Sequence, residues 1–278
     1  MILAVRHKVK LSDITLSYWE WNRGKKPLLL LHGLADCGLV WASLGDYLAA
    51  DYHIVAPDLR GHGDSSKPDK GYGFTDFIGD LEALMAHLGW SSASVLAHSW
   101  SAKILMIWAT KQPERFEKLI LVDPFLMAKI PTWLGLSFPI LYRVLPFLKL
   151  MRSFPTYEAA ETLARQLKQY RGWTPLQEQV FQASIEQKPD GTWSSKFVVP
   201  ARNLIFKEVM EVAGLTQTVD LPTLFIKPHK GLNRISLQMQ PYQTYLPKLQ
   251  VREIPGNHWA FLVEPEIFNR TVAEFLNQ

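Results

Sequence analysis

The sequence predicts an α/β fold with a mostly parallel sheet. Short, largely apolar runs at residues 28–31, 53–56, 94–97 and 119–122, the first of them uninterrupted, are typical of strands that are buried on both faces. Apolar residues at helical spacing lie between several of these runs, most clearly over residues 74–88. Strands that alternate with helices in this way favour a parallel sheet within one α/β domain.

The elements of the N-terminal part follow in order. Residues 5–9 and 14–21 are predicted as two strands, the second with alternating apolar and polar positions. A helix over about residues 41–50 follows the first buried strand. The longer helix over residues 74–88 is expected to stop at Gly89, because glycine commonly ends helices.

The strand–helix rhythm breaks after the strand at residues 119–122. Residues 125–215 show helical patterns, and prolines interrupt the first part of this segment. The rhythm returns with strands at residues 224–226 and 251–254 and a closing helix at residues 265–276. We therefore predict a core formed by residues 1–124 and 216–278, with a helical insertion over residues 125–215.

Composition and charge exclude several classes of protein. The chain has 278 residues, of which 47% are hydrophobic and 20% are charged, so it is not a disordered protein. The formal charge of +4 comes without a clustered basic patch, so we expect no nucleic-acid partner. Residues 1–10 lack the apolar core of a signal peptide, and no apolar run is long enough to span a membrane.

Cys37 is the only cysteine of the chain. A single cysteine excludes an intrachain disulfide and a cysteine-rich metal site. It also fits a reducing compartment, so we expect a cytoplasmic protein. The sequence gives no indication of an oligomeric state.

The run Val-Leu-Ala-His-Ser-Trp-Ser at residues 95–101 carries the strongest functional signal. A strand that turns directly into a helix strains its pivot residue, here Ser99, and holds the side chain out above the sheet. The residues two positions away must be small. Ala97 and Ser101 meet that need, although they replace both glycines of the usual G-x-S-x-G form. The alternative is a serine that only caps the helix.

Five segments of known type occur in a fixed order along the chain. They are His-Gly at residues 32–33, Pro-Asp-Leu-Arg-Gly-His-Gly-Asp-Ser at 57–65, the serine turn at 95–101, Leu-Val-Asp-Pro at 121–124 and Pro-Gly-Asn-His at 255–258. Together they make nearly the whole chain resemble the α/β-hydrolase family. The resemblance implies a mostly parallel eight-stranded sheet, with a helical cap inserted after the sixth strand.

The resemblance also implies a nucleophile, an acid and a histidine in that order along the chain. His258 fits the histidine, because it follows the last strand and precedes the closing helix. The other histidines lie in earlier loops, strands or helices, and His98 is expected to point away from the site. His229, which precedes the last strand, is the remaining rival.

The position of the acid departs from the usual pattern. Most family members carry it after the seventh strand, but the corresponding loop at residues 227–234 has no carboxylate. Asn233 in that loop could bond the histidine without stabilising its charge. The resemblance then favours Asp123, after the sixth strand, where haloalkane dehalogenases and certain polyketide-releasing thioesterases carry their acid. Asp123 could instead bond only its own loop, and Glu253 and Glu264 are further alternatives.

By the same resemblance, the backbone N–H groups of Leu34 and Trp100 form the oxyanion hole. Gly33 is expected to let its loop approach the substrate closely. Such a site needs no metal ion and no organic cofactor, and we expect none. Four polar residues of the segment at 57–65 are expected to brace their loop: Asp58, Arg60, His62 and Asp64. Cys37 is expected to be a buried thiol.

A very apolar stretch, interrupted by prolines, occupies residues 133–148. It has three interpretations: packing against the sheet, a lining for an acyl or aromatic group, and peripheral contact with a membrane surface. All three favour an apolar substrate or surface. The basic loop at residues 227–234 is either solvated or a site for an anionic carrier such as a phosphopantetheine group.

We predict a serine hydrolase that cleaves an ester or thioester of a small apolar substrate through an acyl-enzyme intermediate. Ser99 attacks, His258 transfers the proton and Asp123 orients His258. A carbon–carbon bond hydrolase and a cofactor-free haloperoxidase are alternatives with a similar triad. A dehalogenase is disfavoured, because its nucleophile at the turn is an aspartate. The alternative from another class is a ligand-binding or sensor protein with little turnover.

Overall fold

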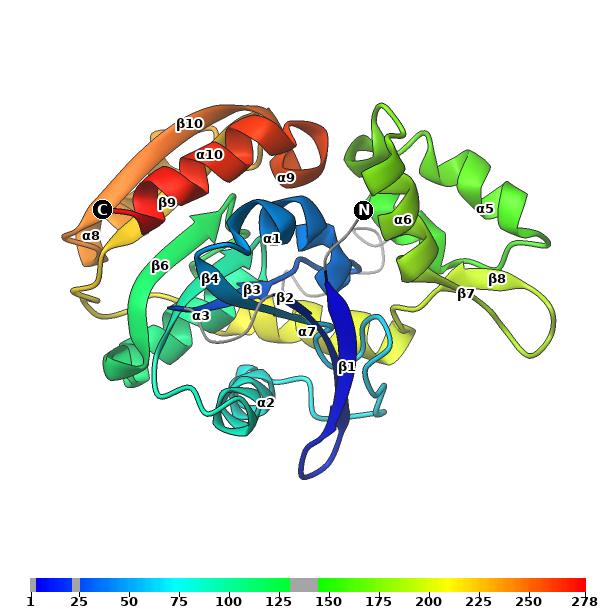
Figure 1. The fold of residues 1–278 in the computed structure, drawn as a ribbon, viewed down its shortest axis with the longest axis horizontal. Coiled ribbons are helices and arrows are strands. Elements are labelled where there is room, and N and C mark those ends of the chain that lie inside the picture. Colours follow the sequence, from blue (N-terminus) through cyan, green and yellow to red (C-terminus); the bar gives the residue numbers. More distant parts are fainter. Residues whose placement is uncertain (1–3, 22–25, 131–144) are drawn as a thin grey trace.

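The computed structural model describes residues 4–21, 26–130 and 145–278. Eight strands form one sheet in the order β1-β2-β4-β3-β5-β6-β9-β10 (Figure 1). Their bounds are β1 (Val5–Lys10), β2 (Thr15–Trp21), β3 (Lys26–Leu31), β4 (Tyr52–Pro57), β5 (Ala93–His98), β6 (Phe116–Val122), β9 (Thr223–Lys230) and β10 (Leu249–Asn257). β2 pairs antiparallel with β1 and β4, and the other neighbours are parallel. The predicted mostly parallel eight-stranded sheet is therefore confirmed.

Helices cover both faces of this sheet (Figure 1). One face packs against α2 (Phe74–His87), α3 (Ser101–Lys111) and α8 (Ser236–Tyr245). The other packs against α1 (Ala42–Leu48), α9 (Ala260–Val263) and α10 (Pro265–Leu276). Along β5, Val95 and Ala97 belong to the first core and Leu96 to the second. Burial on both faces explains the largely apolar runs of these strands.

The insertion at residues 125–215 follows β6 and contains more than the predicted helices. Among its described residues are the α-helices α5 (Tyr157–Ala164), α6 (Pro175–Ser184) and α7 (Val199–Glu211), and the 3-10 helices η4 (Pro146–Met151) and η5 (Lys168–Tyr170). It also holds an antiparallel hairpin of β7 (Ile185–Gln187) and β8 (Trp193–Ser195), which corrects the expectation of helices alone. In the sequence, this hairpin is indicated by the pair Asp190-Gly191. Gly191 adopts a left-handed φ of 83° in the hairpin loop, as such pairs often do.

A buried lysine connects the insertion to the helix that follows Ser99. Lys103 Nζ donates to the backbone carbonyls of Val209 at 2.6 Å, Val212 at 2.8 Å and Ala128 at 3.2 Å. Two of these carbonyls lie at the C-terminal end of α7, where unpaired carbonyls carry partial negative charge. Burial lowers the pKa of Lys103 to about 7, against the opposing effect of Glu208. This contact fixes α7 relative to α3.

No helix in the described ranges has both the length and the apolar character needed to cross a membrane. Most of the apolar stretch predicted at residues 133–148 falls on residues 131–144, which lie outside the described residues. Leu148, near its end, is buried in the core. Membrane contact, the exact domain boundaries and the role of the insertion as a cap therefore stay predictions.

Candidate active site

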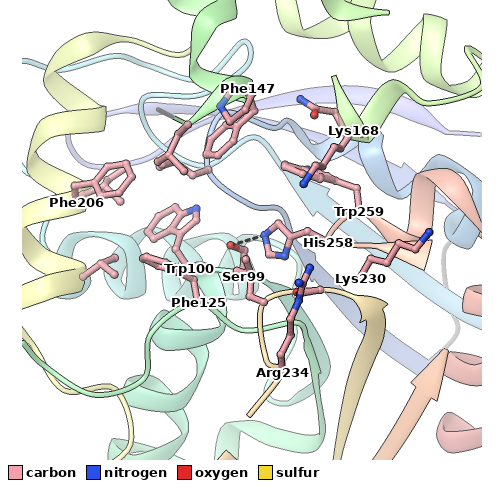
Figure 2. A pocket seen from close by; sticks show the side chains of 18 residues that line it. Ser99, Trp100, Phe125, Phe147, Lys168, Phe206, Lys230, Arg234, His258 and Trp259 are labelled. Carbon is pink, nitrogen blue, oxygen red and sulfur yellow. Dashed lines mark hydrogen bonds between the residues drawn. The ribbon is translucent and has the colours of Figure 1, made fainter. Parts of the chain in front are cut away.

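Ser99 occupies the sharp turn between β5 and α3. Its φ of 59° lies in the left-handed region, which strains a residue other than glycine. Two hydrogen bonds hold the turn against the end of β6. The Ser99 N–H donates to the Val122 carbonyl at 3.0 Å, and the Phe125 N–H donates to the Ser99 carbonyl at 3.1 Å. Backbone groups of the β6 segment thus fix the turn. Ser99 lines a pocket (Figure 2).

Ser101 stands where the second glycine of the usual pattern would be. Its buried Oγ lies 2.8 Å from the His98 carbonyl and 3.2 Å from the Leu31 carbonyl, and it can donate to either. Leu31 ends β3, directly before the loop that begins at His32. The hydroxyl therefore ties the start of α3 to the end of β3, a contact that glycine could not make.

The structure brings the three predicted side chains within hydrogen-bond reach. His258 Nε2 lies 3.0 Å from Ser99 Oγ, and His258 Nδ1 lies 2.7 Å from Asp123 Oδ2. An ionised carboxylate only accepts hydrogen bonds, so Nδ1 carries the proton and Nε2 accepts from the serine hydroxyl. Asp123 is fully buried, whereas the side chain of His258 is 13% exposed. The base is therefore open to the pocket while its carboxylate partner is shielded from water.

Asp123 is held by the loop that lacks a carboxylate. The Leu232 N–H donates to both carboxylate oxygens, at 2.8 Å and 3.0 Å, and Asn233 Nδ2 donates to Oδ1 at 2.9 Å. Burial raises the pKa of Asp123, but the bonds from His258, Asn233 and Leu232 outweigh it and leave the pKa below its usual value. Asn233 therefore supports the carboxylate of Asp123, whereas the alternative considered for Asn233 was a direct bond to the histidine.

Two glycines allow backbone to approach the site closely. A Cβ at Gly231 would lie 2.6 Å from Asp123 Oδ2, so only glycine lets this loop reach the carboxylate. A Cβ at Gly33 would lie 2.5 Å from His98 Nδ1 and 2.9 Å from Asp36 Oδ2. Gly33 thus makes room for two buried side chains, which differs from the expected approach to the substrate.

The predicted oxyanion groups belong to two segments: Leu34 lies in the loop after β3, and Trp100 follows Ser99 directly before α3. Leu34 and Trp100 line the same pocket as Ser99, and within the described part of the chain neither backbone N–H donates a hydrogen bond. His32 fixes the loop after β3, because Nδ1 donates to the Gly33 carbonyl at 2.7 Å and Nε2 accepts from the Leu59 N–H at 3.0 Å. Burial lowers the pKa of His32 to about 4, so the ring stays neutral and keeps both bonds near neutral pH.

His98 lies beside His258, so the expectation that it points away is wrong. The two ring centroids are 4.4 Å apart, and His98 Nε2 donates to the His258 carbonyl at 2.9 Å. His98 Nδ1 has no hydrogen-bond partner among the described residues and lies 3.7 Å from Asp36 Oδ2. Asp36 Oδ2 accepts from Trp259 Nε1 at 3.2 Å. His98 thus holds the backbone of His258, and Asp36 holds the indole ring of the next residue, Trp259. Neither role was indicated by the sequence.

Asp36→Asn is expected to stabilise the protein at neutral pH. Burial raises the pKa of Asp36 to about 6, against the opposing effects of His32 and the Trp259 hydrogen bond. An unfolded aspartate titrates near 3.9. Between these values the folded state binds more protons, so the wild type loses stability as pH rises through this window. Asparagine does not ionise and still accepts from Trp259, so the gain should approach about 3 kcal/mol at pH values well above 6.

Urea unfolding of both proteins at about pH 7 and about pH 4.5 measures this gain. It should be much smaller at the lower pH, where Asp36 is largely protonated in the wild type. Exposed Asp69 provides the matched control, since Asp69→Asn should change the free energy of unfolding little at either pH. An Asp36→Asn variant less stable than the wild type at neutral pH would contradict the prediction.

The segment at residues 57–65 braces its own loop, as predicted. Asp58 accepts from the Gly38 N–H at 2.7 Å and the Asp64 N–H at 2.9 Å, and Arg60 donates twice to the buried Asp80 carboxylate. Cys37 is buried, and burial raises the pKa of its thiol to about 12. The described residues contain no cluster of histidine, cysteine, aspartate and glutamate suited to a metal ion.

Ser99 and His258 open into a pocket of about 260 Å³ (Figure 2). One group of lining residues, which we term the apolar wall, consists of six residues: Trp100, Phe125, Phe147, Ile205, Phe206 and Val209. Three come from α7, the helix that Lys103 fixes. A second group, which we term the cationic rim, consists of Lys168, Lys230 and Arg234. An apolar chain or ring fits against the wall, beside the serine hydroxyl.

Comparisons with known proteins show the family to which the fold belongs. The family model described as alpha/beta hydrolase fold matches residues 26–265. A soluble epoxide hydrolase from Corynebacterium sp. (strain C12) is 34% identical over 117 residues, which are 42% of this chain and 41% of that relative. The chain thus matches less than half the length of that relative. A serine hydrolase-like protein from Danio rerio is 23% identical over 291 residues, covering 98% of this chain and 87% of that one.

Solved structures show the same fold. The crystal structure of E-2-(acetamidomethylene)succinate hydrolase matches with a TM-score of 0.82 and 20% identity, covering 99% of this chain and 100% of that chain. At this level of identity the likeness establishes the fold and not the substrate.

Proposed function

The chain belongs to the alpha/beta hydrolase fold family, and from this premise we propose that it is a serine hydrolase that cleaves an ester or thioester through an acyl-enzyme. One observation carries the proposal: Ser99 Oγ, the His258 ring and the Asp123 carboxylate form a continuous hydrogen-bonded series that opens into an apolar pocket. A nucleophile, its base and a group that orients the base are the parts that acyl transfer requires.

In this proposal His258 Nε2 takes the proton of Ser99 as Oγ attacks the carbonyl carbon of the substrate. The N–H groups of Leu34 and Trp100 bind the negative oxygen that forms. His258 then gives the proton to the leaving alcohol or thiol as the bond to it breaks. Water, deprotonated by the same ring, attacks the acyl group and releases the acid and free Ser99.

The nucleophile favours acyl transfer over the reactions named for some relatives. Attack of a serine hydroxyl on an epoxide or a haloalkane would join Oγ to a saturated carbon and leave an ether. An ether has no carbonyl for water to attack, so the enzyme could not be regenerated. Attack on an ester or thioester leaves an acyl-serine that water can hydrolyse. The residue at position 99 therefore argues against epoxide and haloalkane substrates.

The pocket supports an apolar acyl group as the part of the substrate that is retained on Ser99. A volume of about 260 Å³ bounded by the apolar wall suits a short to medium chain or an aromatic ring. We also propose a cytoplasmic location, for which the single, buried thiol of Cys37 is the support.

Labelling with a fluorophosphonate tests the reaction class. This reagent phosphonylates a serine only where a base activates it and an oxyanion hole receives the oxygen. We expect rapid labelling of the native protein at Ser99, mapped by mass spectrometry of its peptides, and none of heat-denatured protein. Absence of the label would reject the serine hydrolase and favour a protein that only binds its ligand.

A further inference from the structure

Ser99 lies between two chemically different surfaces of one pocket. In Figure 2, Phe206, Trp100 and Phe125 of the apolar wall lie on one side of Ser99, and His258 lies on the other. The cationic rim lies on the His258 side: Lys168, Lys230 and Arg234. The pocket therefore offers an apolar environment on one side of the nucleophile, and on the other side it offers positive charge beside the ring of Trp259.

Contacts of the residue before His258 place two rim residues beside this histidine. Asn257 Nδ2 donates to the backbone carbonyl of Lys168 at 2.9 Å. Asn257 is also the register partner of Lys230 at the end of the β9–β10 pair. Arg234 follows Leu232 and Asn233, which bond the Asp123 carboxylate, and its Nε donates to the Gly231 carbonyl at 2.9 Å. Three segments thus bring a cation to the same edge of the site.

The rim is not neutralised by any carboxylate in the part of the chain that the structure describes. Among those residues no carboxylate lines the pocket, and none forms an ion pair with Lys168, Lys230 or Arg234. The nearby Glu253 pairs with Lys227 at 2.8 Å. All three rim residues are exposed, so they keep their charge at little desolvation cost. An anion that enters the pocket mouth would be their first partner of opposite charge.

The chemistry of the site decides which part of a substrate meets the rim. His258 must give its proton to the leaving oxygen or sulfur, so the leaving group lies on the His258 side of Ser99. The acyl group then occupies the remaining space against the apolar wall. An anionic substituent on the leaving alcohol or thiol would therefore lie at the rim, whereas one on the acyl group would face apolar side chains.

We propose that the substrate joins an apolar acyl group to an alcohol or thiol that carries a carboxylate or a phosphate. The anion binds Lys168, Lys230 and Arg234 and directs the scissile bond to Ser99. This inference rests on the proposed serine hydrolase for the orientation of the substrate. Exposed ion pairs are weak singly, so three cations acting together should favour the anionic ligand about tenfold. Salt should reduce this preference.

Ligand binding tests the rim without turnover. Two pairs of thioethers, which contain no scissile acyl bond, each differ only in the anion. One pair is S-hexyl-pantetheine 4′-phosphate and S-hexyl-pantetheine, and the other is 3-(hexylthio)propionate and its primary amide. Calorimetry should give a Kd about tenfold lower for the anionic member of at least one pair than for its neutral member. A larger Kd ratio in the pantetheine pair would identify phosphate as the preferred anion, and a larger Kd ratio in the propionate pair would identify carboxylate. The ratio should shrink near 1 M salt, where charges are screened within about 3 Å.

Charge reversal at the rim provides the sharper comparison. Lys230→Glu should bring the Kd ratio to one or below, and Lys168→Gln should lower it. Lys70 is exposed outside the pocket, so Lys70→Glu makes the same change of net charge and should keep the wild-type ratio. Equal affinities within both pairs, failure of all four ligands to bind, or a ratio insensitive to Lys230→Glu would each overturn the inference. Labelling of Ser99 is independent of these ratios, so failure of the rim and failure of the serine hydrolase are distinguishable.

Discussion

Ser99→Ala is expected to lower kcat/KM for a short aryl ester by about 10⁵-fold. Ser99 Oγ is the atom that lies 3.0 Å from His258 Nε2, and alanine leaves this base without a nucleophile to activate. Water in the pocket could react slowly, because the oxyanion groups and the apolar wall remain. The loss should therefore approach the full contribution of the triad while the binding of substrate changes little.

Initial rates with a series of 4-nitrophenyl esters measure this loss. The alanine side chain fits the same turn, so the circular dichroism spectrum and the thermal midpoint should stay close to those of the wild type. Ser91 is exposed, and Ser91→Ala is the matched control, which should keep wild-type rates. Full activity in Ser99→Ala would reject the proposed function outright.

The strands of the sheet were predictable because each is indicated by a pattern that lies within a few consecutive residues. Strands buried on both faces need largely apolar runs, and each such run, as at Val95–Ala97, is readable within a few residues. The turn at Ser99 was readable for the same reason, since its small neighbours are required by the turn itself. Asp123 was a candidate because the loop at residues 227–234 has no carboxylate, and the structure places Asp123 2.7 Å from His258.

Other parts of the site depend on contacts between distant segments. Asp36 meets Trp259, and Lys103 meets Val209, across more than a hundred residues of chain. Neither residue stands in a local pattern that indicates such a partner. Ser101 looked like a tolerated replacement of glycine, whereas its hydroxyl bridges two strands' ends. Such contacts follow from the folded arrangement and leave no periodic trace in the sequence.

The second large effect is expected for Asp123→Asn, which should lower kcat by about 10⁴-fold with little change in KM. Four donors face the carboxylate: the Leu232 N–H, the Asn233 N–H, Asn233 Nδ2 and His258 Nδ1. An asparagine has one oxygen and one NH₂ group in place of two oxygens. Oδ1 faces both Leu232 and Asn233, so the amide oxygen should keep that position.

The NH₂ group would then face His258 and donate to Nδ1. A ring that accepts at Nδ1 must carry its proton at Nε2, and Nε2–H cannot take the proton of Ser99. The variant would also lack the negative charge that stabilises the protonated ring during attack. Both effects act on the chemical step and leave the apolar wall untouched, so kcat should fall while KM stays near its wild-type value.

Asn233→Ala provides the matched comparison for this position. It removes the donor at 2.9 Å from Asp123 but leaves the carboxylate bonded to Leu232 and His258, so kcat should fall only about tenfold. Glu253→Gln changes a carboxylate that is exposed and paired with Lys227, and should have a smaller effect still. Should either substitution reduce kcat more than Asp123→Asn, the orienting carboxylate would lie elsewhere. The order of the three effects therefore decides the assignment, because Asp123 bonds the ring of His258 directly, whereas Asn233 bonds Asp123 and Glu253 bonds Lys227.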